Sequence, residues 1–186
     1  CASRHIDLNA VFELVLTELM HENLVLAGTL ATSEAQRAQL WRLREGMAQA
    51  MIADKAAIKS DTAVPVAALT DFLRTANAAV QAIAPGCVPV PMGHIGDGNI
   101  HYNLLPPPGM AASDFMQHKR ALSAAIEDAA LALGGTVSAE HGVGLVKRSA
   151  LERMRGGAEL DAMRRLKAAF DPGAVLNPDK VFKAQA

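Results

Sequence analysis

GHIGDGNIHYN, at residues 93–103, is the most informative stretch of this 186-residue chain. Asp97-Gly98 at its centre is a strong signal for a β-hairpin turn. The turn predicts two antiparallel strands, over Val88–Ile95 and Ile100–Leu105. An antiparallel sheet is therefore expected at the middle of the chain.

Two histidines belong to this hairpin. A hairpin folded symmetrically about Asp97-Gly98 places His94 directly opposite His101, and directly opposed residues share one face of a sheet. Asn103 lies two residues beyond His101 and shares that face. The opposite face is expected to carry residues for a core, namely Ile95, Ile100 and Tyr102.

Side-by-side imidazoles are half of a site for zinc or another divalent metal. His94 and His101 cannot complete such a site, so a third ligand, preferably a carboxylate, must come from another part of the chain. The alternative for an isolated pair is a cross-strand contact on a sheet surface without any metal. The hairpin alone leaves both interpretations open.

A second motif, SAEHGVG at residues 138–144, offers the missing groups. Glu140 can supply the carboxylate, and small residues around it let the backbone approach a ligand closely. His141 would then lie beside the metal, where a neutral imidazole is suited to take a proton from a substrate hydroxyl. The alternative is an ordinary polar end of a helix or strand.

Apolar spacing predicts the remaining elements. Proline and glycine mark several of their ends, and Thr32-Ser33 is a candidate helix cap. Helices are expected over Leu8–Met20, from Ser33 to Met51, and over Val66–Ile83, Ser113–Leu133 and Glu159–Phe170, with further strands over Leu24–Leu30 and Ala57–Val64. This order predicts one α+β domain over residues 1–186, with an antiparallel sheet and helices packed on one face. A doubly wound parallel sheet is the alternative.

Composition narrows the class of protein. Apolar residues make up 51% and charged residues 20%, which is typical of a globular chain rather than a disordered one. The net charge of −1 removes the electrostatic reason to expect nucleic acid or an anionic membrane as a partner. Two cysteines, Cys1 and Cys87, suit a reducing compartment, so a cytoplasmic location is expected. The chain starts at Cys1 without a basic-then-apolar leader, and we expect it to be part of a longer or processed protein.

Three motifs together resemble a known family. GHIGDGNIH, SAEHGVG and FDPGAVLNPDKVF are similar to the C-terminal part of FAD-linked oxidases of the vanillyl-alcohol-oxidase type. The branch that they resemble is the D-2-hydroxyacid dehydrogenases, which act on D-lactate, D-2-hydroxyglutarate or glycolate. The resemblance runs from about Ile6 to Phe182, with the motifs in the family's order. It implies a ferredoxin-like cap domain that carries the substrate site.

The resemblance also implies roles for individual residues. A metal, usually zinc, would be held by His94, His101 and Glu140, and His141 would act as the base. The substrate carboxylate would be held by Arg44, in Leu43-Arg44-Glu45, and by Lys59, in Lys59-Ser60-Asp61. Further residues implied near the metal, the substrate or the flavin are Asn103, Asn177 and Lys180.

Two features depart from the family's pattern. A threonine that helps with the distal carboxylate of D-2-hydroxyglutarate is replaced here by Ala48. The family binds FAD chiefly through an N-terminal domain, and no glycine-rich pyrophosphate loop is found in this chain. The chain is thus expected to be the C-terminal domain of such an enzyme, with the N-terminal FAD domain as its partner.

The expected reaction converts a D-2-hydroxy acid into a 2-oxo acid. A divalent metal would lower the pKa of the substrate hydroxyl, and the hydride requires FAD because no amino acid accepts it. One alternative is a stand-alone metal-dependent hydrolase that uses the same two histidines and Glu140. The other is a non-catalytic assembly domain with a structural metal or none. The sequence leaves the electron acceptor and the oligomeric state open, a homodimer included.

Overall fold

The computed structural model describes residues 6–53 and 56–183, which form two compact units divided after Ala50. The first unit contains α1 (Leu8–His21) and nearly all of α2 (Glu34–Ala53). Each helix begins at a side-chain cap: the Asp7 carboxylate accepts the Asn9 N–H at 3.0 Å, and the Ser33 hydroxyl accepts the Gln36 N–H at 3.3 Å. Both predicted helices and the Ser33 cap are confirmed.

The predicted strand over Leu24–Leu30 is wrong. The structure has turns and irregular chain there, and the side chains of Leu24 and Leu26 are 72% and 88% exposed. A short apolar run fits a strand by its pattern, but a strand also needs a partner for its N–H and C=O groups. Among the described residues, the only sheet has three strands, and none of them belongs to this unit.

The second unit is built on that antiparallel sheet, with β3 (Asn99–Leu105) between β1 (Thr62–Ala63) and β2 (Val88–His94). β1 is shorter than the strand predicted over Ala57–Val64, although an isolated bridge joins Ile58 to Leu104. Between these pairings the Ser60 hydroxyl donates to the Tyr102 carbonyl at 2.8 Å. A hydrogen bond from a side chain thus takes the place of a backbone hydrogen bond between the strands. The predicted antiparallel sheet is confirmed.

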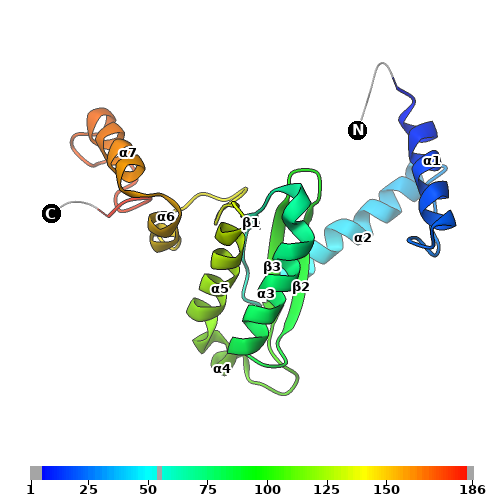
Figure 1. Ribbon diagram of the computed structural model, residues 1–186, viewed down its shortest axis with the longest axis horizontal. Coiled ribbons are helices and arrows are strands. Elements are labelled where there is room, and N and C mark those ends of the chain that lie inside the picture. Colours follow the sequence, from blue (N-terminus) through cyan, green and yellow to red (C-terminus); the bar gives the residue numbers. More distant parts are fainter. Residues whose placement is uncertain (1–5, 54–55, 184–186) are drawn as a thin grey trace. The chain divides into compact units, whose positions relative to one another are not determined.

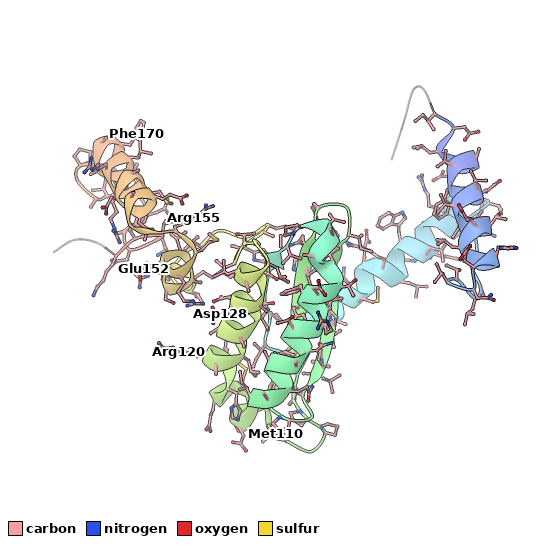
Figure 2. The ribbon with its side chains drawn as sticks, in the orientation of Figure 1. Met110, Arg120, Asp128, Glu152, Arg155 and Phe170 are labelled. Atoms are coloured by element: carbon pink, nitrogen blue, oxygen red, sulfur yellow. The ribbon has the colours of Figure 1, made fainter. Side chains whose placement is uncertain are left out.

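One face of the sheet is covered by helices (Figure 1). α3 (Leu69–Ile83) follows a short 3-10 turn, η1 (Val66–Ala68), and packs against α5 (Lys119–Ala132). Their apolar sides meet alternate residues of β3 in a core whose largest members are Tyr102, Phe72, Phe115, Ile58, Leu104, Leu122, Ile126 and Val80. The exposed Arg120 of α5 points away from α3 (Figure 2). The α+β fold with helices on one face is confirmed.

The hairpin register differs from the prediction. His94 pairs with Asn99 and Met92 pairs with His101, so the loop spans four residues, Ile95 to Gly98, instead of two. Ile95 is 73% exposed in this loop, and its predicted place in the core is wrong. The loop is shaped from outside the hairpin: the Gly98 carbonyl accepts the Val64 N–H at 3.1 Å, which brings the chain after β1 against the turn.

The C-terminal part contains more helices than the sequence predicts. The helix expected over Ser113–Leu133 is two helices, α4 (Ala112–Gln117) and α5, which meet at His118. α6 (Arg148–Met154) was not predicted, whereas α7 (Gly157–Phe170) confirms the last predicted helix. No helix of the described chain is long and apolar enough to span a membrane.

Candidate functional site

The polar face of the sheet, opposite the helices, carries the histidines. His94 ends β2 and His101 lies within β3, and the observed register makes them diagonal neighbours rather than directly opposed. A shift of two residues keeps every side chain on its face, whereas a shift of one would exchange the faces. The two rings therefore still approach each other, with centroids 6.1 Å apart.

Glu140 reaches both histidines from a loop that follows α5. Its Oε1 lies 2.9 Å from Nδ1 of His94, and its Oε2 lies 3.7 Å from Nε2 of His101. The three side chains are 40%, 26% and 45% exposed for His94, His101 and Glu140, respectively. The structure thus brings together the three predicted metal ligands, on a surface that a small molecule can reach.

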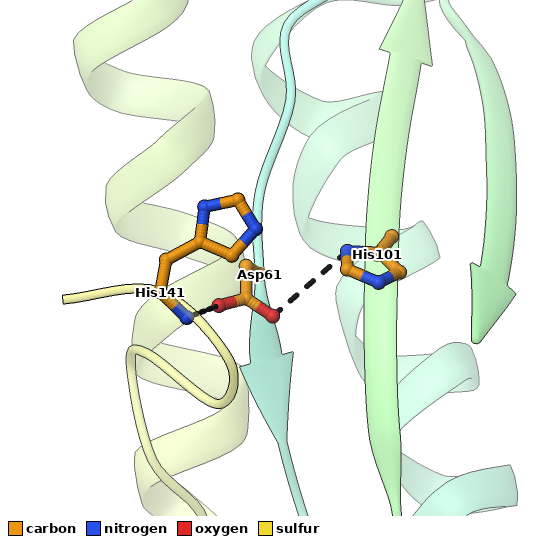
Figure 3. Close-up of side chains that lie close together, drawn as sticks. All are labelled: Asp61, His101 and His141. Atoms are coloured by element: carbon orange, nitrogen blue, oxygen red, sulfur yellow. Dashed lines mark hydrogen bonds and ion pairs between the residues drawn. The ribbon is translucent and has the colours of Figure 1, made fainter. Parts of the chain in front are cut away.

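Asp61 holds this loop in place. Its Oδ2 accepts the backbone N–H groups of Ala139, Glu140 and His141 at 3.1, 3.1 and 3.0 Å, respectively. Its Oδ1 accepts the side-chain amide of Asn99 at 2.8 Å and lies 3.8 Å from Nδ1 of His101. Figure 3 shows the carboxylate between the His141 loop and His101.

Asp61 is ionised in this setting although it is buried. Burial raises the pKa of the carboxyl, but the hydrogen bonds from His141, Asn99, Ala139 and Glu140 outweigh burial and lower the pKa below its ordinary value. A carboxylate that accepts several N–H groups is stabilised in its charged form. Asp61 therefore presents a fixed negative charge next to His101.

Lys147 is a half-buried cation in the same region. Its ammonium donates to the carbonyls of Asp61 and Val137, at 3.0 and 2.6 Å. Burial lowers the pKa of Lys147, while the charges of Asp61 and Glu127 oppose that effect. Lys147 thus ties β1 to the chain segment that leads into the Glu140 loop.

Two candidate ligand sets share His101. The first is His94, His101 and Glu140, in which Glu140 contacts both histidines, at 2.9 and 3.7 Å. The second is Asp61, His101 and His141, whose ligand atoms lie within 4.8 Å of one another. Both oxygens of Asp61 already accept N–H groups, so a metal at Asp61 would compete with those bonds. The Glu140 carboxylate instead faces His94 and His101, and two imidazoles with one carboxylate suit a divalent cation with positions left for substrate. The donor chemistry therefore fits the first set better.

His141 lies beside these ligands. Its ring centroid is 6.3 Å from that of His101, and its side chain is exposed. Its carbonyl accepts a hydrogen bond from the Ser138 hydroxyl. Its backbone is fixed on both sides while the imidazole is open to solvent, an arrangement that suits proton transfer with a bound molecule.

The other predicted residues are placed as follows. Asn103 is buried on the same face of β3 as His101. The pairing of β1 with β3, extended toward the bridge between Ile58 and Leu104, sets Lys59 opposite Asn103, and Lys59 is exposed. Arg44 lies on α2 in the first unit, with its guanidinium 6.0 Å from the Trp41 ring centre. Asn177 and Lys180 form one turn after α7 and line the same surface cavity.

Sequence reasoning missed Asp61, Asn99 and Lys147. Asp61 belongs to the Lys59-Ser60-Asp61 run, in which the family resemblance implies a role only for the lysine. An available signal was the placement of an aspartate in the strand beside a histidine-bearing hairpin. The partner loop lies almost eighty residues further on, since the bonds to Ala139 and Glu140 span 78 and 79 residues, and spacing cannot reveal it.

Comparison with known proteins gives a consistent result. A family model described as FAD linked oxidases, C-terminal domain, matches residues 1–181. The chain is 39% identical over 164 residues to D-2-hydroxyglutarate dehydrogenase of Xanthomonas citri pv. viticola, a match that covers 88% of the chain and 34% of that protein. The corresponding enzyme of Stutzerimonas stutzeri is 38% identical over 160 residues, covering 86% of the chain and 34% of the enzyme. The mitochondrial enzyme of Rattus norvegicus is 34% identical over 176 residues, covering 92% and 31%. The chain spans about a third of the length of these relatives.

Proposed function

The chain belongs to the family of FAD linked oxidases, C-terminal domain, and from this premise we propose that it is the substrate- and metal-binding part of a D-2-hydroxy acid dehydrogenase. The observation that carries the proposal is the convergence of His94, His101 and Glu140 on the open face of the sheet. The D-2-hydroxyglutarate dehydrogenases among its relatives support the reaction class.

His94, His101 and Glu140 would hold a divalent metal, and zinc is the metal to test first. When bound, such a metal supplies positive charge that lowers the pKa of a substrate hydroxyl. Nε2 or Nδ1 of His141 then takes the hydroxyl proton, since this imidazole lies next to the ligands and is open to solvent. Asn103, on the face of His101, would help to position the substrate.

Arg44 and Lys59 are proposed to bind the substrate carboxylate. A guanidinium offers a planar fork to a carboxylate, and an ammonium adds a point charge. These roles rest on the family resemblance of Leu43-Arg44-Glu45 and Lys59-Ser60-Asp61. Arg44→Ala and Lys59→Ala are therefore expected to raise KM more than they lower kcat in the enzyme that carries this chain.

FAD would supply the hydride acceptor and would be bound chiefly by a further domain of that enzyme. Asn177 and Lys180 are proposed to approach the flavin from the turn after α7. D-2-hydroxyglutarate is the first substrate to test because the relatives carry that name. The resemblance implies a threonine that contacts the second carboxylate of D-2-hydroxyglutarate, and this chain has Ala48 in its place. D-lactate, which lacks a second carboxylate, is therefore the comparison substrate.

The alternative of a stand-alone metal-dependent hydrolase is not favoured, because family membership points to flavin chemistry. An assembly domain with a structural metal is not favoured either. A structural zinc usually has four protein ligands, whereas the favoured set has three, all of them partly exposed to solvent.

The test is elemental analysis of the purified 186-residue chain beside two histidine variants. We expect about one divalent metal per chain in the wild type, and loss of that metal in His94→Ala because one of only three protein ligands is removed. His21→Ala is the matched control, since His21 is an exposed histidine in the last turn of α1. Equal metal content in all three proteins would contradict the assignment of His94.

A further inference from the structure

Asp61 is buried between β3 and the loop that carries Glu140 and His141, and only 4% of its surface is exposed. One carboxylate oxygen accepts three consecutive backbone N–H groups, at 3.0–3.1 Å, from Ala139, Glu140 and His141. Three successive N–H groups converge on a single anion in this arrangement. The position of the Glu140 carboxylate and the His141 imidazole thus depends on Asp61.

The other oxygen of Asp61 faces His101. Thr62 pairs with Ile100, so extending this antiparallel register by one residue sets Asp61 opposite His101. The distance from Oδ1 to Nδ1 of His101 is 3.8 Å, while Nε2 of the same ring faces Glu140. A histidine that binds a metal through one ring nitrogen commonly offers the other to a carboxylate, which fixes the ring's orientation.

Asp61 itself is held from behind. The Lys147 ammonium donates to its backbone carbonyl at 3.0 Å, and the Asn99 amide donates to its Oδ1 and to the Thr62 carbonyl, at 2.8 and 3.3 Å. Asn99 is 2% exposed. The carboxylate is therefore an anchored group to which the loop attaches.

We propose that Asp61 is a positioning residue that holds Glu140 and His141 at the right distance from His94 and His101 before a metal or substrate binds. This inference rests on the proposed function of the site. Asp61 acts through the loop backbone and through His101 rather than as a ligand, because its Oδ2 already accepts three N–H groups and its Oδ1 accepts the Asn99 amide.

The structure suggests a variant that separates charge from shape. Asp61→Asn keeps the volume of the side chain but removes its charge. The Asn99 Oδ1 atom is buried without a hydrogen-bond partner, so a rotation of the Asn99 amide would let this oxygen accept from the new amide. Asp61→Asn is therefore expected to fold, whereas Asp61→Ala also removes the acceptor for the three loop N–H groups.

The matched control is Asp171→Asn. Asp171 is 6% exposed and accepts the backbone N–H groups of Val175 and Leu176 at 3.0 Å each. It is thus a second buried aspartate that holds a loop by the same type of bond, but the hydrogen bonds to its carboxylate come from Lys167, Val175 and Leu176 and not from a histidine of the candidate site. A general loss of stability should occur in both Asp61→Asn and Asp171→Asn, whereas an effect on the site should occur only in Asp61→Asn.

The first measurement is amide hydrogen exchange on the metal-free 186-residue chain. We expect the amides of residues 139–141 to exchange at least about 10-fold faster in Asp61→Asn, because neutral hydrogen bonds are roughly half as strong as charge-assisted ones. The core amides of Ile58 and Leu104, which bond across the sheet at 2.9 and 2.8 Å, should be unchanged. Asp171→Asn should leave residues 139–141 as in the wild type.

The second measurement is Zn²⁺ affinity by competition with a chelator, for the same proteins. Loss of a carboxylate behind a metal-binding histidine commonly weakens metal binding 10–100-fold, so we expect Asp61→Asn to raise the Kd for Zn²⁺ at least about 10-fold. Asp171→Asn should stay within about twofold, since it lies outside the hydrogen-bond network of the site. Together with faster exchange at residues 139–141, this result supports the inference.

Two results would overturn the inference alone: a Kd equal to that of the wild type in Asp61→Asn, or residues 139–141 that exchange as slowly as before. The first would make Asp61 a structural residue without effect on the site. A wild-type chain that binds no Zn²⁺ would instead overturn the proposed metal site, and the inference with it. The two failures are thus distinguished by the wild-type protein.

Discussion

His141 and Asp61 contribute to the site in different ways. The imidazole of His141 is exposed, while its backbone N–H is held by a hydrogen bond to Asp61. The side chain can therefore contact a substrate from a fixed backbone position. Asp61 is buried and ionised, and its negative charge lies 3.8 Å from a nitrogen of His101. At the level of single residues, the site thus combines an exposed imidazole with a buried, fixed charge.

Replacement of His141 by alanine tests the proton-transfer role in the enzyme that carries this chain. General acid–base groups contribute typically about 10²–10⁴-fold, so kcat should fall within that range while KM for the D-2-hydroxy acid changes little. Steady-state kinetics with an artificial electron acceptor measures both constants. His21→Ala should behave as the wild type, and an unchanged kcat in His141→Ala would remove this residue from the role of base.

Asp171 provides a pH-dependent contribution to stability. The Lys167 ammonium at 2.5 Å, with the N–H groups of Leu176 and Val175, lowers the pKa of Asp171 against an opposing effect of burial. Its ionised form therefore stabilises the fold. This contribution is fully present above the unfolded-state pKa of about 3.9 and is lost as pH falls through the lower pKa of the folded state.

The corresponding prediction concerns Asp171→Asn. We expect this variant to melt below the wild type at pH 7, and the difference in Tm to shrink as the pH is lowered below about 4. Thermal unfolding followed by circular dichroism at several pH values gives the comparison. A Tm difference that stays constant down to pH 2 would show that the charge of Asp171 does not stabilise the fold.

At the scale of elements, the hairpin loop depends on Gly98. This residue has φ +73°, and a Cβ there would lie 1.9 Å from the Val64 carbonyl oxygen. A left-handed conformation costs a residue with a side chain about 1–2 kcal/mol, and the clash adds to that. Gly98→Ala should therefore lower the free energy of unfolding by at least about 2 kcal/mol in denaturant titrations.

Gly96 in the same loop is the control for that substitution. A Cβ at Gly96 would meet nothing within 4 Å, and the residue is exposed. Gly96→Ala should change the free energy of unfolding by no more than about 0.5 kcal/mol. Equal effects of the two substitutions would mean that the contact between Gly98 and Val64 does not restrict the hairpin.

The same loop shows which features of the fold the sequence predicts and which it does not. Asp97-Gly98 predicted the hairpin, because turn preferences are local. The register was wrong by two residues because the Val64 N–H, a group outside the hairpin, pairs with Gly98. The histidines nevertheless share a face as predicted, since a shift of two residues preserves the alternation of side chains.

Long-range contacts explain the other differences. Leu24–Leu30 has the composition of a strand, but no described strand pairs with it. The role of Asp61 could not be predicted, because its donors at residues 139–141 are distant in sequence and are backbone groups that carry no sequence signal. Local patterns thus predict elements and motifs, whereas tertiary hydrogen bonds decide how they meet.

At the scale of the whole molecule, the candidate residues are divided between the two units. The proposed metal ligands and His141 all belong to residues 51–186, whereas Arg44 belongs to residues 1–50. The chain spans about a third of the length of the relatives that it matches. Metal binding is therefore the property that the second unit should show by itself.

Removal of residues 1–50 tests this division. Because the proposed ligands and the hydrogen bonds of Asp61 all lie within residues 51–186, the shortened chain should bind Zn²⁺ with a Kd within about twofold of the full 186-residue chain. His94→Ala in the shortened chain should abolish that binding, because it removes one of three ligands. Protection of the Ile58 and Leu104 amides from hydrogen exchange serves as the check that the sheet is intact. If the shortened chain keeps this protection but loses Zn²⁺, residues 1–50 must contribute to the site, and the assignment of all protein ligands to the second unit is wrong.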